Sequence, residues 1–202
     1  MARGASTLVV IGLLSAVGVP DASAWATPLP CTDRDSSAVF SHWLDPAQYF
    51  QAANGGFERG TDDWSFSTGA SVQAGNESFR VGGSTDEHSV VLTPGASVES
   101  HTACVTLGEP TMRLFVKAPR TLGAGLRIDA TVENPTTGVT LQSSYVVLGG
   151  LAPSQWAPTP EILVPNLLGG ILPENLTIRI TAVGVPATWS VDDVYVDPFK
   201  SR

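Results

Sequence analysis

The chain has 202 residues and a formal net charge of −8, with only 11 Lys and Arg residues. Nucleic acids and anionic membranes bind proteins through clusters of Lys and Arg. The sequence has no such cluster, so its composition excludes both as partners, and its length suits one domain with a substantial core.

Residues 1–24 have the parts of a secretory signal peptide. Arg3 precedes an apolar run at residues 7–19, and the tripeptide A-S-A supplies a small-residue cleavage site. A membrane anchor is the alternative, but the run is shorter than the roughly 20 apolar residues that a spanning helix needs. We therefore expect cleavage after Ala24 and a secreted, extracellular protein without a membrane span.

The remaining sequence predicts an arm, residues 25–49, followed by one β domain, residues 50–202. The arm contains a segment at 38–50 that could begin as a short helix, and Pro46 limits its length. From residue 50 onward, short alternating runs are separated by Gly, Pro, Asn and Asp, which is typical of strands joined by turns.

Three runs show the strand pattern most clearly. Residues 111–117, 125–133 and 175–182 alternate apolar and polar side chains, as half-buried strands do. Many short strands without a long helix favour two packed antiparallel sheets. The predicted fold class is therefore all-β, a two-sheet sandwich preceded by a short arm.

The two cysteines, Cys31 and Cys104, are predicted to form a disulfide. An even number of cysteines is typical of disulfides in exported proteins. Metal binding or thiol catalysis would need further ligands close in sequence, and neither cysteine has them.

Two adjacent aspartates, Asp192 and Asp193, lie in the middle of the last strand-like run, residues 187–197. The apolar positions are odd up to Val191 and even from Val194 onward, so the alternation slips by one residue. A β-bulge produces such a slip, because one extra residue re-aims the side chains around it. We expect a bulge here, so that the aspartates do not face the core without a partner.

Three motifs resemble those of galactose-binding-like carbohydrate-binding modules. "NGGFERGTDDW" at 54–64 and "WSVDDVYVDP" at 189–198 resemble the first and last strands of such modules, and "SQWAPT" at 154–159 resembles a Trp-led strand between them. The layout is also similar to that of a group of uncharacterised secreted proteins from high-GC bacteria. The resemblance implies a jelly roll over residues 50–198, although a fold of this kind does not fix a function.

The resemblance also implies a structural calcium ion, because the first and last strands of such modules commonly share one. It assigns Glu58, Asp192 and Asp193 as ligands, completed by main-chain carbonyls of residues 54–56. The chemistry agrees, since Ca²⁺ takes six to eight oxygen ligands and removes the repulsion between carboxylates. The alternative is that these carboxylates are solvated at strand ends.

A glycan site requires exposed aromatic or hydrogen-bonding side chains. Three tryptophans fall where the jelly roll buries a ring and are predicted to lie in the core: Trp64, Trp156 and Trp189. The candidate ligand-binding residues are Arg127, Asp129 and Arg179, as hydrogen-bonding groups on one wet sheet face, and Tyr145, as a platform for a sugar ring on that face. The parity of Tyr145 with Ser143 and Val147 does not fix the side on which its ring lies.

The remaining chemistry signals are weak. The chain has no G-x-S-x-G motif and no assignable Ser-His-Asp set, so we expect no enzymatic activity. Residues 86–88, Asp-Glu-His, resemble metal ligands but are more typical of a turn in this Gly-rich stretch. The apolar stretch 162–172 is predicted to close one end of the sandwich, and an exposed patch for a protein partner is the alternative.

These patterns favour an exported, non-catalytic, lectin-like module that binds a polysaccharide or another glycan. The alternative function is a structural or protein-interaction component of the cell envelope without a sugar site.

Overall fold

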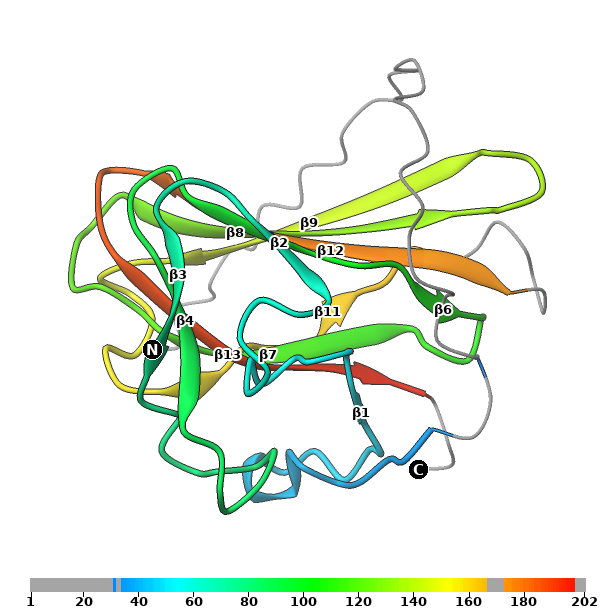
Figure 1. Ribbon diagram of the computed structural model, residues 1–202, viewed down its shortest axis with the longest axis horizontal. Coiled ribbons are helices and arrows are strands. Elements are labelled where there is room, and N and C mark those ends of the chain that lie inside the picture. The colour runs from blue at the N-terminus through cyan, green and yellow to red at the C-terminus, as the bar shows by residue number, and fades with distance from the viewer. Residues whose placement is uncertain (1–30, 32–33, 167–172, 199–202) are drawn as a thin grey trace, which may run out of the picture.

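The computed structural model describes residues 31, 34–166 and 173–198, which form two β-sheets and one three-residue 3-10 helix. Figure 1 shows the sheets as an upper and a lower layer. The strands are β1 Phe50–Gln51, β2 Trp64–Phe66, β3 Ala70–Ala74, β4 His88–Leu92, β5 Ser97–Ser100, β6 Ala103–Val105, β7 Thr111–Lys117, β8 Ala124–Glu133, β9 Thr140–Leu148, β10 Ala157–Pro158, β11 Ile162–Leu163, β12 Glu174–Gly184 and β13 Trp189–Asp197.

All strand pairs in the two sheets are antiparallel. The first sheet, called here the β7 sheet, has the order β10-β7-β13-β4-β3, with β1 beside β13 and β11 beside β7. The second, the β12 sheet, has the order β2-β5-β12-β8-β9, with β6 beside β12. The predicted all-β class with two antiparallel sheets is confirmed.

The three clearest sequence patterns form strands where they are predicted. β7 has the predicted bounds, and β8 and β12 extend the predicted runs by a few residues. β12 pairs with β8 from Asn175 to Gly184. This register places most apolar residues of both strands on the inner face and most of their polar residues on the outer face.

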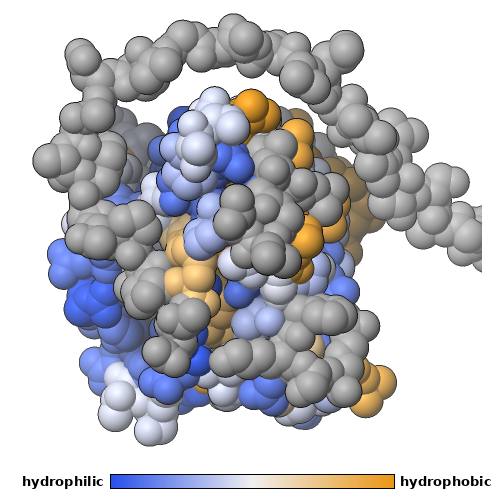
Figure 2. Space-filling view, turned by 90° about the vertical axis from the view of Figure 1, so that its right-hand side faces the viewer, coloured by the Kyte–Doolittle hydropathy of each residue, from blue (hydrophilic) through white to orange (hydrophobic). Residues whose placement is uncertain are grey.

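The core lies between the sheets and includes two of the three predicted tryptophans. Trp189 is 0% exposed and Trp64 is 4% exposed, which confirms both predictions. Trp156 is only half-buried and packs at the margin of a separate aromatic cluster, so its predicted place in the core is wrong. The side seen in Figure 2 is mostly hydrophilic outside the grey atoms, with a few separate apolar groups.

The arm covers the outer face of the β7 sheet through aromatic packing. The Phe40 ring stacks on Phe115 with centroids 5.6 Å apart and meets the Tyr49 ring edge-on at 4.7 Å. The Arg113 guanidinium lies 4.4 Å from the Phe40 centroid and bonds Asp45 at 2.6 Å. Burial raises the pKa of Asp45, but the hydrogen bonds from Tyr49 and Arg113 lower it by a larger amount. The net pKa of Asp45 is therefore below its ordinary value.

The short helix expected in the arm is a single 3-10 turn, Ser41–Trp43. It ends at Leu44, which has a left-handed backbone with φ of 61°. The position of Pro46 two residues later agrees with the predicted limit on helix length.

The predicted disulfide between Cys31 and Cys104 is present, with the two Cα atoms 5.1 Å apart. It joins the arm to β6, at the margin of the β12 sheet. Arg34 strengthens the same attachment, because its guanidinium donates to the carbonyl of Cys104 and lies 4.1 Å from the centroid of the Phe50 ring.

Two predictions fall wholly or partly outside the described residues. The signal peptide, residues 1–24, lies outside them, as do residues 167–172 of the apolar stretch. Of that stretch, Ile162 and Val164 are buried and Leu163 is 62% exposed. Within the described ranges, no helix is both long and apolar enough to cross a membrane.

Candidate functional site

The bulge expected in the last strand lies where β13 meets β7 and β1. The pairing of β13 with β7 shifts between Asp192 and Tyr195, and Asp193 has a left-handed backbone with φ of 49°. Few non-glycine residues adopt this conformation. The predicted bulge is confirmed, and both aspartates are 0% exposed. The alternative that they are solvated at a strand end is therefore wrong for this pair.

Asp192 is held by main-chain N–H groups. Its Oδ2 accepts from the N–H of Glu77 at 2.8 Å, and its Oδ1 accepts from the N–H of Asp193 at 2.9 Å. Burial, followed by the charge of Asp193, raises the pKa of Asp192 to about 9. Asp192 thus fastens the β3–β4 loop to the bulge, with its charged form disfavoured at neutral pH.

Asp193 is less well satisfied. Its Oδ1 accepts from the side-chain amide of Gln51 at 2.7 Å, whereas its Oδ2 is buried without a hydrogen-bond partner among the described residues. Burial, followed by the charges of Glu77 and Asp86, raises the pKa of Asp193 to about 7. A buried oxygen without a partner is costly, so a proton or a cation would stabilise this position.

Asp86 brings a second carboxylate to the same place. A Cβ atom on Gly82 would lie 2.5 Å from Asp86 Oδ2 and 2.6 Å from Asp193 Oδ1, so both oxygens approach the space next to Gly82. Burial, followed by the charge of Glu58, raises the pKa of Asp86. The charge of Asp86 in turn raises the pKa of Asp193, so a cation between the two carboxylates would be favourable.

Glu77 adds a buried negative charge behind this pair. Its carboxylate accepts from the N–H groups of Phe79 at 2.5 Å and Val81 at 2.7 Å, which fixes the β3–β4 loop. Burial raises the pKa of Glu77. Because both of its oxygens already accept main-chain hydrogen bonds, Glu77 contributes charge and loop structure.

Glu58 has a different role from the one predicted. Its Oε1 accepts from the N–H groups of Glu87 at 2.9 Å and His88 at 2.8 Å, and its Oε2 lies 3.0 Å from His88 Nδ1. Burial raises the pKa of Glu58, but these hydrogen bonds lower it to a net value below the ordinary one. Glu58 thereby joins the opening motif to the start of β4.

The predicted trio of Glu58, Asp192 and Asp193 is not assembled as one ligand set. Among the described residues, no three His, Cys, Asp or Glu side chains are grouped as metal ligands. The carboxylates that approach each other are those of Asp193 and Asp86, next to Gly82, and carboxylate oxygens are ligands that a hard cation takes. The reason for the difference is that main-chain N–H groups occupy both oxygens of Asp192, whereas main-chain N–H groups and the His88 ring occupy those of Glu58.

Three of the four predicted ligand-binding residues lie together on the outer face of the β12 sheet. Arg179 on β12 is opposite Asp129 on β8 and Glu99 on β5, so charged side chains form a row across the strands. Arg127 lies two residues from Asp129 and bonds it through Nε at 2.9 Å. The row continues to Ser144 on β9, whose hydroxyl donates to Asp129 at 2.6 Å.

This polar row presents hydrogen-bonding groups to solvent. The side chains of Arg127 and Arg179 are 46% and 52% exposed, whereas that of Asp129 is 6% exposed. Asp129 therefore acts as a fixed anchor that orients the Arg127 guanidinium. Guanidinium groups present several N–H donors in a fixed plane, which suits neighbouring hydroxyl groups of a ligand.

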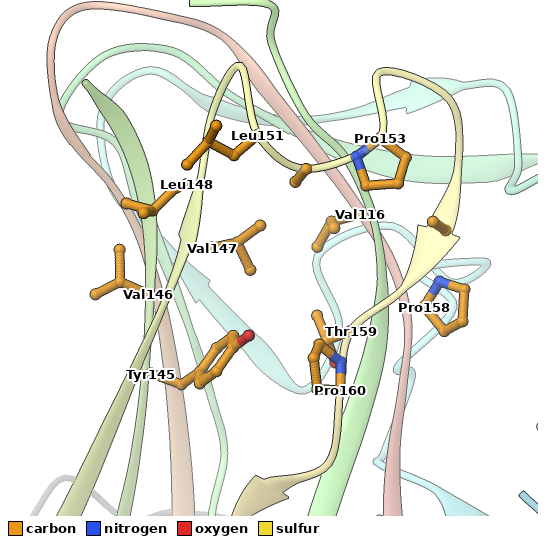
Figure 3. Close-up of a pocket in the computed structure, with 12 residues that line it drawn as sticks. Val116, Tyr145, Val146, Val147, Leu148, Leu151, Pro153, Pro158, Thr159 and Pro160 are labelled. Atoms are coloured by element: carbon orange, nitrogen blue, oxygen red, sulfur yellow. The ribbon is translucent and has the colours of Figure 1, made fainter. Parts of the chain in front are cut away.

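Tyr145 does not lie on this face. It is opposite Ile128 in the β8–β9 pairing, so its side chain shares the inner side of the sheet with apolar residues. Figure 3 shows the Tyr145 ring directed from β9 toward Thr159 and Pro160, into a pocket of about 340 Å³. Burial raises the pKa of Tyr145. The expectation that Tyr145 and the two arginines share one surface is therefore wrong.

Sequence reasoning missed two residues of the bulge site, Glu77 and Asp86. Asp86 belongs to the acidic run 86–88, which the sequence predicts as part of a turn; the turn lies at residues 84–85, and the run leads from it into β4. Glu77 gives no sequence signal, because it lies in an irregular loop without periodicity. Only the pairing of β13 with β4 brings this loop beside the bulge.

No protein-family model matches the chain, and no curated protein sequence matches it. Several solved structures are similar to it. TmCBM61 in complex with beta-1,4-galactotriose is 19% identical, with 72% of this chain and 96% of that chain covered and a TM-score of 0.45. CBM28, a non-crystalline cellulose specific carbohydrate-binding module, is 13% identical over 73% and 94% of the two chains, with a TM-score of 0.48.

A third similar structure is the family 11 carbohydrate-binding module of the cellulosomal cellulase Lic26A-Cel5E of Clostridium thermocellum. It is 13% identical over 73% of this chain and 94% of that chain, with a TM-score of 0.44. At these identities and TM-scores, none of the ligands of these proteins can be transferred to this chain.

Proposed function

We propose that the chain is a non-catalytic carbohydrate-binding module that contacts a polysaccharide or another glycan through the outer face of the β12 sheet. The observation that supports the proposal is the cross-strand row of Glu99, Arg179, Asp129 and Ser144, extended by Arg127. Such a row offers donors and acceptors to a series of hydroxyl groups along an extended chain.

The composition of this face also sets the expected strength of binding. The outward positions of β8 and β12 are polar except for Gly125 and Val183, and none of them carries an aromatic ring. Binding then depends on hydrogen bonds that replace those to water, and each contributes little. We expect weak binding, with dissociation constants on the order of 0.1–1 mM.

Replacing both Arg127 and Arg179 by Ala should abolish glycan binding. The measurement is retention on insoluble polysaccharides together with a glycan array. The matched control is Arg120→Ala, which removes an exposed arginine that bonds Ser154 and does not belong to the row. Binding that is equal in the double variant and the wild-type protein would contradict the proposed surface. Absence of binding in both assays would favour the alternative, a protein-interaction component of the cell envelope.

We also propose that the chain is exported. The disulfide supports this, because such bonds persist mainly in oxidising compartments. The signal-like composition of residues 1–24 supports it independently.

A structural calcium ion is the third part of the proposal, with Asp193 and Asp86 as its side-chain ligands. The unpartnered Asp193 Oδ2 and the approach of both carboxylates to Gly82 support it. When bound, the ion would supply positive charge between these side chains and fasten the β3–β4 loop to the bulge. Such an ion would stabilise the folded state and would have no catalytic role.

Chelation with EDTA should lower the melting temperature of the protein, and added calcium should restore it. At a hundredfold excess over its dissociation constant, a ligand stabilises the native state by about 2.7 kcal/mol, or roughly 5–10 °C for a chain of this size. Differential scanning calorimetry measures the shift. Asp193→Asn should lose the calcium response, whereas Asp35→Asn, at an exposed position of the arm, should keep it.

A further inference from the structure

Strand β9 forms a sheet edge that differs from the other edges of this protein. The β12 sheet ends at β2 on one side and at β9 on the other, and the β7 sheet ends at β3 and β10. Within the described part of the chain, β8 is the only strand that pairs with β9. The opposite side of β9 therefore presents its main-chain N–H and C=O groups without a strand partner.

The other edges carry the features that normally prevent association between sheets. β2 has three residues and β3 has five, and β10 has two residues, one of which is Pro158. Short strands and proline limit the pairing that an edge can offer to another chain. β9 has nine residues, contains no proline and pairs with β8 without a register shift.

The sequence around β9 also lacks charge, which is one of the usual protections of an edge. Residues 134–160 contain no Asp, Glu, Lys, Arg or His, although the whole chain has 15% charged residues and a net charge of −8. Copies of an acidic chain repel one another over most of their surface. A segment without charge is the part on which two copies can meet without that repulsion.

Apolar side chains are exposed along the same edge. Val146 is 42% exposed, Leu148 is 50% exposed and Leu151, in the following loop, is 73% exposed. They border the pocket that Tyr145 enters (Figure 3), whose lining is apolar except for the hydroxyl groups of Tyr145 and Thr159. Contact with a second apolar surface would remove these side chains from water, which is favourable in proportion to the buried area.

We propose that β9 is a self-association edge, on which a second copy of this chain adds its own β9 in antiparallel orientation. Antiparallel pairing of two identical strands places the same surface on both sides of a two-fold axis, so the contact closes as a dimer and does not grow into a filament. The two β12 sheets become one continuous sheet. The absence of charge on both sides of the contact favours a second copy over a charged partner.

Val146→Glu is the variant that tests this interface. Val146 is opposite Arg127 in the β8–β9 pairing, so a glutamate there gains a cross-strand partner within its own chain and the fold is retained. In the dimer, each new carboxylate would be partly removed from water at the contact, which is costly for a charged group even with Arg127 beside it. The matched control is Leu107→Glu, which adds the same charge at a side chain with similar exposure, 44%, in the turn after β6.

The measurement is sedimentation equilibrium of the full chain over a range of concentrations, with circular dichroism to verify the fold of each variant. We expect a dimer for the wild-type and Leu107→Glu proteins. We expect a dimer dissociation constant raised by about tenfold or more in Val146→Glu. A monomer at all concentrations in the wild-type protein, or equal dissociation constants in all three proteins, overturns the proposal.

Hydrogen exchange of the unmodified protein provides a test without a substitution. The N–H groups on the edge of β9 that faces away from β8 should exchange more slowly at high protein concentration than at low concentration, because β9 of the second copy protects them. Those of the edge strand β3, Ala70–Ala74, should show no such dependence. Equal exchange of β9 at both concentrations overturns the proposal.

Discussion

Replacing Cys104 by Ser should lower the free energy of unfolding by about 4 kcal/mol, in the chain-entropy account of a cross-link with this loop length. The disulfide joins residues that are 73 positions apart, so it restricts a large part of the unfolded chain. In the native state it holds the arm to β6, where Arg34 also donates to the Cys104 carbonyl. Urea denaturation with a spectroscopic probe measures the difference.

The matched variants separate loss of the bond from loss of a side chain. Cys31→Ser and the double variant should each show the same loss as Cys104→Ser, because all three remove one bond. A reduced wild-type protein should also match them. A loss in Cys104→Ser that Cys31→Ser does not share would show that the effect arises from packing at the buried β6 position instead of the cross-link.

The strands that build the β12 sheet could be predicted because their surroundings differ on the two sides. Leu126 and Ile128 face the core, whereas Arg127 and Asp129 lie on the outer face, and this contrast produces a clear alternation. The bulge could be predicted for the same reason, since it shifts the parity of buried positions in β13. The disulfide required only the cysteine count and the expectation of export.

The side on which Tyr145 lies could not be predicted, because the alternation in β9 is weak. Ser143 and Tyr145 occupy inner positions and Ser144 and Val146 occupy outer ones, so both faces mix polar and apolar residues. β9 is an edge strand over a pocket, and neither of its faces is fully buried. The register between β9 and β8 determines the side on which Tyr145 lies. This register depends on both strands, so the sequence of β9 alone does not give it.

The arm and the bulge site show a second limit of sequence reasoning. Phe115 has the outward parity of β7 and would face solvent in an isolated sheet, but Phe40 of the arm covers it. Asp86 and Asp193 meet although more than half of the chain separates them. Contacts of this kind depend on how loops cross a sheet, and no local periodicity encodes them.

Without calcium, the protein should become less stable as the pH rises from about 4 toward 9, and Asp193→Asn should weaken this dependence. Burial raises the pKa of Asp193 to about 7 and that of Asp192 to about 9. Both values lie above those of the unfolded chain, so the folded state binds more protons over this range. Stability is therefore fully present below the unfolded pKa and is lost as the pH rises through the folded values.

For Asp193 alone, the difference between the folded and unfolded pKa corresponds to a stability change on the order of 4 kcal/mol. Asp193→Asn removes this charge and retains a side chain that tolerates the left-handed backbone at φ of 49°. At pH 8 in EDTA, this variant should therefore be more stable than the wild-type protein. Calorimetry at pH 5 and pH 8, with and without calcium, provides the comparison.

Asp192→Asn serves as the contrasting variant in the same experiment. Both oxygens of Asp192 accept main-chain N–H groups, and an amide keeps only one acceptor oxygen, so this variant should lose stability at pH 5. Calcium should remove most of the wild-type loss at pH 8, because the cation binds the deprotonated carboxylates. If Asp193→Asn is less stable than the wild-type protein at pH 8 in EDTA, the Asp193 carboxylate is stabilised in its charged form by the protein itself. In that case neither a proton nor a calcium ion is needed at the bulge.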